Sequence, residues 1–316
     1  MTRTISLIFA GFVACGGSRP VASVEIPLPQ PQSQSGVYAI HFDHPSRVGE
    51  RSHYVVTADE ERMTTTRRGK DVTSDVHMKK RGRLDAIATV MTLDAAGKTG
   101  DVLFDIADLS YSDDGRELLH KRRGKLMVAR AKHEADAKVT LDGVEATDEM
   151  REAVKLLLTL TNGGPDDDEV MGPPGPQRIG SHWRVDGTRA AEALSKEEGG
   201  EMMNGAHVSG DAWLEGVGLV NGIDCLDVHA IVHIDGLDTT SKVPGAVADV
   251  ARITMTVSAK IPVDGARGRV SDHQIIEATV KLKTPSPNGE ITMETNYASR
   301  RDGVYEALSP EGGASR

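Results

Sequence analysis

The chain has 316 residues, enough for one large domain or two of roughly 100–150 residues each. Its 37 basic and 47 acidic residues give a net charge of −10, which argues against nucleic acid because phosphate backbones would be repelled. Aromatic residues make up only 3%, so the stacking platforms that bind sugars or single-stranded bases are scarce.

The N-terminus has the pattern of an export signal. In Met1–Ala14, Arg3 precedes an apolar run that is too short to span a bilayer as a helix. The run ends on Phe12-Val13-Ala14-Cys15-Gly16, which resembles the lipobox of bacterial lipoproteins, although Phe12 stands where that family usually has an aliphatic residue. The alternative is an ordinary secretory leader cut before Val24, with Cys15 discarded.

The resemblance implies that Cys15 is lipidated, becomes the new N-terminus and anchors the protein to a bacterial membrane. Residues 15–36 are rich in Gly, Pro, Gln and Ser, as expected of a flexible tether. Gly16 is not the aspartate that marks inner-membrane retention, so the resemblance favours the outer membrane, with the folded part facing the periplasm. Cys225 then has no partner for a disulfide, and its strand-like surroundings predict a buried core residue rather than a nucleophile.

Residues 37–162 form a first half dominated by strands. Period-two patterns predict a hairpin from Asp85–Leu93 and Val102–Ser110, and a second pair from Lys125–Ala131 and Ala137–Leu141. The spacing then changes, and a helix is predicted over Asp148–Thr161. Thr147 is its predicted N-cap, and Asn162-Gly163 its stop.

Residues 163–180 contain four prolines and five glycines, which predicts an irregular connector. The second half, 181–308, begins with a short predicted helix over about 188–198, and 309–316 reads as a disordered tail. Strands are predicted at Ala212–Val217, Ile223–Ile234, Arg252–Ile261, His273–Lys283 and Glu290–Tyr297. The predicted fold class is therefore α+β, β-dominated and antiparallel, in two β-rich halves. This organisation resembles uncharacterised β-rich envelope lipoproteins, a resemblance that brings no catalytic residues and no cofactor.

The most metal-like sequence is His41-Phe42-Asp43-His44. On a strand, His41 and Asp43 would share a face about 6.6 Å apart. The stretch is reminiscent of the H-x-H-x-D-H motif of metallo-hydrolases, but Ala39 occupies the first histidine position. A solvated strand end before Pro45 is the favoured interpretation.

Two other candidate ligand sets are weaker. His229 and His233 would lie roughly 13 Å apart along a strand, too far to share an ion, so a polar sheet face is the simpler interpretation. Asp166–Glu169 lacks the alternation of a calcium loop and reads as a solvated acidic loop.

Three basic clusters, each around a glycine, lie in the first half of this acidic chain. They are interpreted either as separate solvated hairpin ends or as one face that contacts lipid phosphates or an acidic partner. The candidate contact residues are Arg67, Arg68, Lys70, Lys80, Arg81, Arg122, Arg123 and Lys125.

No catalytic motif is found. The first functional hypothesis is a non-enzymatic envelope lipoprotein that binds a partner protein or has a structural role. The second is a periplasm-facing carrier of an acyl or other apolar ligand, held between a curved sheet and the 148–161 helix, with Ala86, Thr89, Val90 and Val102 as lining. A metal-dependent hydrolase comes third.

Overall fold

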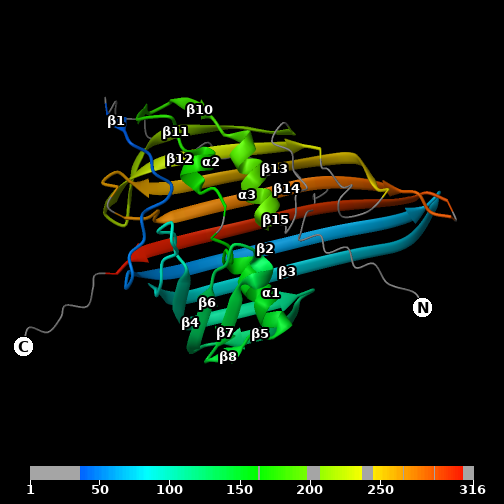
Figure 1. Ribbon diagram of the computed structural model, residues 1–316, viewed down its shortest axis with the longest axis horizontal. Helices are drawn as coiled ribbons and strands as arrows, with labels where there is room; N and C mark the ends of the chain where they lie inside the picture. Colours follow the sequence, from blue (N-terminus) through cyan, green and yellow to red (C-terminus); the bar gives the residue numbers. More distant parts are fainter. Residues whose placement is uncertain are drawn as a thin grey trace, which may run out of the picture.

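The computed structural model describes residues 36–162, 164–197, 207–236, 245–265, 267–287 and 289–308. Cys15, nearly all of the predicted tether and the 309–316 tail lie outside these residues. The dominant element is a 13-stranded antiparallel sheet in the order β10-β11-β12-β13-β14-β15-β2-β3-β4-β6-β7-β8, with β5 paired to β4 (Figure 1). The predicted β-dominated, antiparallel α+β class is confirmed.

The helices are few, and the strands near the middle of the sheet are long. The helices are α1 (Asp148–Leu157), α2 (Asp167–Met171) and α3 (Gly187–Glu197), with a 3₁₀ turn at Glu134–Asp136. The strands of the large sheet are β2 (Arg51–Arg68), β3 (Asp71–Val90), β4 (Asp101–Asp113), β5 (Arg116–Lys121), β6 (Gly124–Ala129), β7 (Lys138–Leu141), β8 (Val144–Glu145), β10 (His182–Arg184), β11 (Val208–Val220), β12 (Ile223–Asp235), β13 (Val247–Pro262), β14 (Ser271–Thr284) and β15 (Ile291–Ala307). A separate two-stranded sheet joins β1 (Val37–Tyr38) to β9 (Gln177–Arg178).

Most neighbours in the sheet are consecutive in the chain, but the central pair is not. The C-terminal strand β15 pairs with β2 from Ile291↔Arg68 to Ala307↔Ser52. This pairing makes the strands of both predicted halves one continuous sheet. Tight turns close the hairpins: Asn221 and Gly222, between β11 and β12, both have positive φ, as a type I′ turn requires.

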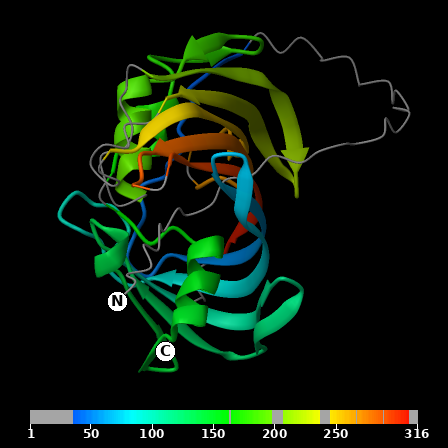
Figure 2. The ribbon, with the colours of Figure 1, turned by 90° about the vertical axis from the view of Figure 1, so that its right-hand side faces the viewer.

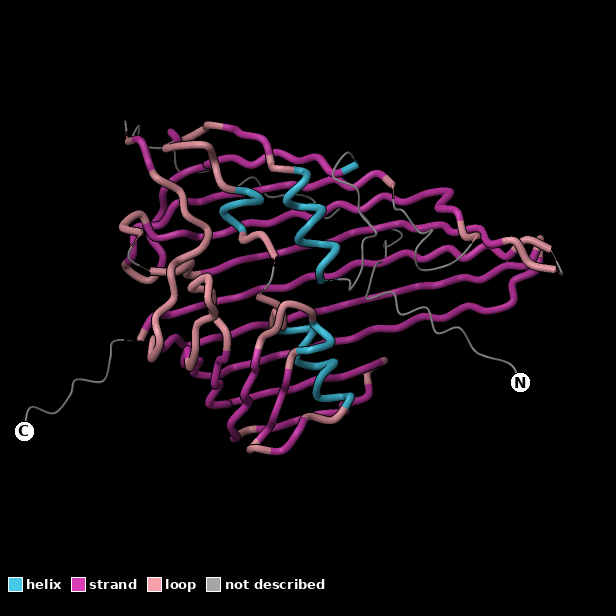
Figure 3. Tube along the Cα trace, viewed as in Figure 1, coloured by secondary structure: helices cyan, strands magenta, loops and turns pink. Residues whose placement is uncertain are grey.

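The sheet is strongly curved, and the helices lie on its concave side (Figure 2). The tube view shows α1 across one end of the sheet and α2 and α3 across the other (Figure 3). In the described part of the chain, no helix is both long and apolar enough to cross a bilayer.

Two hydrophobic cores fill the concave side, one under each group of helices. The first packs α1 on strands β2 to β7, and Leu84, Leu126 and Leu157 are fully buried there. The second packs α2 and α3 on β11 to β14 around Leu214 and Leu226. Each core follows from period-two alternation in its strands, because every second side chain points to the concave face.

The predicted helix 148–161 begins correctly but ends early. Thr147 accepts a hydrogen bond from the Met150 amide at 3.3 Å, as an N-cap should. Leu158 is extended, so α1 ends at Leu157, and the Ala131 amide donates to the Leu160 carbonyl at 3.2 Å. The sequence suggested a longer helix because Leu158 and Leu160 are apolar, but both are buried in the first core as extended chain.

The connector 163–180 is not irregular throughout. Asp166 and Glu169 form a capping box that starts α2, so the acidic run is a helix N-terminus rather than a solvated loop. Further along, β9 pairs with β1. The second basic cluster also departs from expectation: residues 79–83 lie in the interior of β3 and not at a hairpin end.

Candidate ligand-binding face

The concave face between the two cores is formed by β13, β14, β15, β2 and β3. The side chain of Lys80 on β3 points to the concave side, because its Nζ lies 2.8 Å from Glu152 of α1, and α1 lies on that side. Counting in steps of two from Lys80 along β3 and across the paired strands places each inward side chain. Met78 pairs with Arg62, and Val76 with Thr64, so all four face inward with Lys80.

Five apolar side chains on this face remain partly accessible, although Ala278, Val280 and Leu282, which lie between Ile276 and the partner of Met293 on β14, are buried. We call Val76, Met78, Met255, Ile276 and Met293 the methionine strip. Val76 is 45% exposed, and the other four are half-buried. Met255 pairs with Ile276. Met293 of β15 pairs with Leu282, which is six positions from Ile276 along β14, so the five side chains span roughly 20 Å. Methionine is common on surfaces that accept varied apolar ligands, because its side chain is flexible and polarisable.

Hydroxyl groups lie beside the strip on the two central strands. The Thr64 and Thr295 hydroxyls, on β2 and β15, are 3.2 Å apart. Thr66 and Ser299 face the same side, by their pairing with Met293 and Glu60. The face is therefore amphipathic, with apolar and hydroxyl side chains within reach of one ligand.

A charged cluster borders the strip under α1. Lys80, whose side chain is only 15% exposed, lies between Glu60, its pairing partner on β2, and Glu152. Burial raises the pKa of Glu60, and the nearby Lys80 and Arg62 only partly offset this. Burial also acts to raise the pKa of Glu152. The hydrogen bond and the charge attraction between Glu152 and Lys80 outweigh burial, so the Glu152 pKa is lowered.

A second polar network anchors the connector to the sheet. Arg269 pairs with Asp167 of α2, with Asp43 at 3.3 Å and with Asp272 at 3.6 Å. Burial alone would lower the pKa of this guanidinium, but the three carboxylates raise it. The Tyr305 hydroxyl donates to Asp272 at 3.1 Å. A buried cation among carboxylates that fix two segments reads as a structural clamp.

The predicted metal residues take part in that clamp instead of converging on an ion. His41 Nδ1 lies 3.8 Å from Asp168, and Asp43 accepts from the Asp167 amide at 2.8 Å while pairing with Arg269. His44 has a buried Nδ1 without a hydrogen bond, but it joins no ligand cluster among the described residues. His41, Asp43 and His44 therefore do not form a metal site.

The structure does not gather the basic residues into one cluster. Arg67, Arg68 and Lys70 lie at the tip of the β2–β3 hairpin, while Arg122 and Arg123 lie between β5 and β6. Register through β4 puts Lys121 opposite Leu84 of β3, so these groups are separated by roughly 45 Å along that strand.

The other candidate cations have acidic partners. Lys80 contacts Glu152 on the concave face, Arg81 contacts Asp59 at 2.8 Å on the convex face, and Lys125 contacts Asp105 at 3.9 Å.

Cys225 is fully buried, as predicted. Its thiol contacts the Ile223 carbonyl at 3.4 Å, and burial raises its pKa. A thiol held protonated is a poor nucleophile, which agrees with a packing role.

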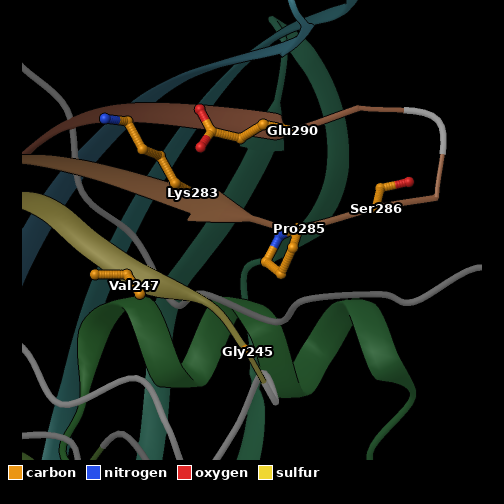
Figure 4. Close-up of a pocket in the computed structure, with 6 residues that line it drawn as sticks. All are labelled: Gly245, Val247, Lys283, Pro285, Ser286 and Glu290. Carbon is orange, nitrogen blue, oxygen red and sulfur yellow. The ribbon is translucent and has the colours of Figure 1, made fainter.

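One pocket of about 410 Å³ lies near the tip of the β2–β3 hairpin, away from both cores. Figure 4 shows its lining residues Gly245, Val247, Lys283, Pro285, Ser286 and Glu290. Lys283 in this lining is already paired with Asp249 at 3.1 Å.

Sequence reasoning missed the strip and its charged border. Alternation in β2 and β3 was visible, but which strands lie beside them was not. The strip uses β13, β14, β15 and β3, and β3 is brought to the other three strands by the pairing of β15 with β2.

Comparisons with known proteins do not identify the chain. No protein-family model and no curated protein matches it. Among solved structures, lipovitellin aligns over 87% of this chain and 26% of its own, at 9% identity and a TM-score of 0.34. An outer membrane channel from Pseudomonas putida F1 aligns over 85% and 97%, at 11% identity and a TM-score of 0.19. Likeness at these levels supports no statement about function.

Proposed function

We propose that the protein is a non-enzymatic, lipid-anchored envelope protein that binds an acyl or other apolar ligand on the concave face of its sheet. The observation that supports this most is the methionine strip, whose side chains stay partly accessible on the concave face, with Met255 and Ile276 at the edge of the second core. Single accessible apolar side chains are ordinary, but several grouped on one face are typical of a ligand or partner site. Three methionines, a valine and an isoleucine on one concave surface favour an apolar ligand over a polar one.

The ligand lies on the strip and not beneath α1. Between α1 and the sheet there is no space, because Leu157 and Leu156 pack directly on Gly82 of β3. Ala86 and Val102, which the sequence suggested as a lining, are filled core positions. The lid arrangement imagined from the sequence is therefore wrong, and α1 closes a core instead of covering a ligand.

A polar end of the ligand would contact the hydroxyls of Thr64 and Thr66, with Lys80 and Arg62 nearby. These cations are balanced by Glu60 and Glu152, so the face does not demand a strongly anionic head group. A single-chain amphiphile with a hydroxyl, ester or weakly acidic head fits this chemistry.

The binding proposal is tested by lipid extraction and ligand displacement. Protein purified from its own membrane should release a bound acyl compound in mass spectrometry, and a fluorescent fatty acid should bind and be displaced by that compound. Met78→Gln combined with Met293→Gln should weaken binding about tenfold, since each loses roughly 0.7 kcal/mol of apolar contact.

Met63→Gln is the matched control. Met63 lies on β2 beside Met78 but on the convex face, 42% exposed. Equal loss of binding in both variants, or no bound lipid and no saturable probe binding, would leave only the structural or protein-partner role.

The anchoring proposal rests on the sequence that ends at Cys15, as does the orientation at the outer membrane. Cys15→Ser should move the protein out of the membrane fraction or leave its leader uncleaved. A variant that is processed normally and stays with the outer membrane would show that the leader is an ordinary secretory one.

A further inference from the structure

On the convex face, behind the second core, three ligating side chains converge. Glu215, Asp227 and His229 each offer one atom, and these atoms all lie within 4.8 Å of one another. The His229 Nε2 is 2.7 Å from Glu215 Oε2 and 3.2 Å from Asp227 Oδ1. Among the residues that the structure describes, no other group of three His, Cys, Asp or Glu side chains has this geometry.

The sheet itself creates the convergence. Asp227 and His229 are two positions apart on β12, so they share a face. Register across to β11 pairs Leu214 with Val228 and Gly216 with Asp227, which leaves Glu215 as the extra residue of a β-bulge. Bulges redirect side chains, and this one brings Glu215 toward His229.

The contacts at His229 do not form an ordinary hydrogen-bonded ion pair. The His229 Nδ1 lies 2.8 Å from the Ser258 hydroxyl on β13, which can accept a hydrogen bond from the Nδ1–H group. Neither His229 Nε2 nor Asp227 Oδ1 has a hydrogen bond of acceptable direction, although both atoms are buried from solvent. An imidazole that donates from Nδ1 turns its Nε2 lone pair toward two carboxylates. Three acceptors so close together repel one another unless a metal ion lies between them or Nε2 carries a proton.

We propose that Glu215, Asp227 and His229 form a divalent-metal site, and that Zn²⁺ is the ion it suits best. Zinc bonds to histidine nitrogen and carboxylate oxygen at about 2.0–2.2 Å, so its tetrahedral ligands are roughly 3.3 Å apart. The 3.2 Å from His229 Nε2 to Asp227 Oδ1 matches this spacing, and Glu215 Oε2, at 2.7 Å from Nε2, would move outward slightly to bind the ion. Three protein ligands leave a fourth position, which faces solvent because the Glu215 side chain is 62% exposed.

Neighbouring side chains hold the ligands in place. Ser258 fixes one imidazole nitrogen and leaves the other for the metal, the usual second-sphere arrangement. The Trp213 ring stacks on the His229 ring, with centroids 5.3 Å apart and planes at 14°. The His182 ring also stacks on Trp213, with centroids 5.9 Å apart. Lys260 pairs with the second oxygen of Asp227, so it competes weakly with the ion while leaving Oδ1 available.

Metal titration of the full-length protein tests the site. The protein carries no polyhistidine tag, is stripped with chelator in detergent and is then titrated with Zn²⁺ by calorimetry. One equivalent should bind, and His229→Ala or Glu215→Gln should weaken binding about tenfold or more. His233→Ala is the matched control, because His233 lies on the same strand and face and its Nδ1 is 3.3 Å from a different hydroxyl, that of Thr254.

Two further measurements locate the ion. Ni²⁺ should quench the fluorescence of Trp213, and Trp213→Phe should abolish that quenching while Zn²⁺ still binds. Lys260→Gln should tighten binding, since it removes the competing cation. Absence of saturable Zn²⁺ binding, or binding that His229→Ala leaves unchanged, would overturn the proposal and identify the cluster as a protonated imidazole between two carboxylates. Ligand binding on the concave face is unaffected by any of these outcomes.

Discussion

The two ends of the concave face and its middle use the same alternating strands for different purposes. At the ends, helices close the alternating side chains into cores in which Leu157 and Leu214 are fully buried. In the middle, the same alternation leaves Met78, Met293 and Val76 partly accessible, while Val280, Leu282 and Tyr297 on the same face are buried. The comparison teaches that alternation alone does not decide how far a side chain is buried, so truncation should cost stability at the closed positions under the helices and binding at the partly accessible methionines.

The largest effect is expected at the centre of the first core. Leu157→Ala should lower the free energy of unfolding by about 2–5 kcal/mol, because it opens a cavity under α1. Met78→Ala, in the middle, should cost less than about 1 kcal/mol, since a half-buried side chain leaves no closed cavity. Urea denaturation of both variants measures the difference, and equal losses would show that the middle is as tightly packed as the core.

The close approach of α1 to the sheet gives the next largest effect. A Cβ on Gly82 would lie 3.1 Å from the Leu157 side chain, so Gly82→Val should cost about 1–3 kcal/mol by overpacking. Gly218→Val is the control, because a Cβ there has nothing within 4 Å and valine suits a strand. If both variants unfold at the wild-type denaturant concentration, α1 does not rest on β3.

In the second core, a buried hydrogen bond joins the connector to the sheet. Trp183 Nε1 donates to the Met171 carbonyl at 2.6 Å. Trp183→Phe should cost about 1–3 kcal/mol, because the carbonyl at the end of α2 loses its donor away from water. Trp213→Phe, on the convex face, should cost clearly less in the same thermal melts. The reverse order would mean that α2 is not held through this bond.

The smallest effect is a pH dependence of opposite sign at two glutamates beside Lys80. The pKa of Glu60 is raised, so its ionisation destabilises the fold as pH rises from 4.5 through the folded-state pKa. The pKa of Glu152 is lowered, so its stabilisation is complete above 4.5 and is lost as pH falls through the folded-state pKa.

Glu60→Gln should therefore gain stability relative to wild type as pH rises toward 7, whereas Glu152→Gln should lose it, each by less than about 1 kcal/mol. Melting temperatures between pH 4 and 7 measure both differences. Curves that run in the same direction would show that the two carboxyls share one environment.

Much of the local structure could be read from the sequence. Period-two alternation located the β3–β4 and β6–β7 pairs, and Thr147 marked the start of α1. The C-terminal limits were less accurate, because Leu158 and Leu160 keep an apolar pattern in extended chain. Residues 79–83 show the same difficulty: a run of cations suggests a turn, but in β3 each cation finds a carboxylate on its own side of the sheet.

The candidate sites were harder to foresee. In the sequence, the evident partner for His229 is His233, which lies too far along the strand to share an ion with it. The two carboxylates that approach it are Asp227, two positions away, and Glu215, which a bulge on the neighbouring strand redirects.

By itself, the sequence determined the alternation of the strands, the cap of α1 and the pattern that ends at Cys15, because these depend on residues close together in the chain. Tertiary structure alone decided that β15 pairs with β2, that Gly82 receives α1 and that three methionines from three strands share one face. Strand order and register are those that give the whole sheet its lowest free energy when its apolar side chains are buried. That free energy depends on residues far apart in the chain, so no short window of sequence determines it.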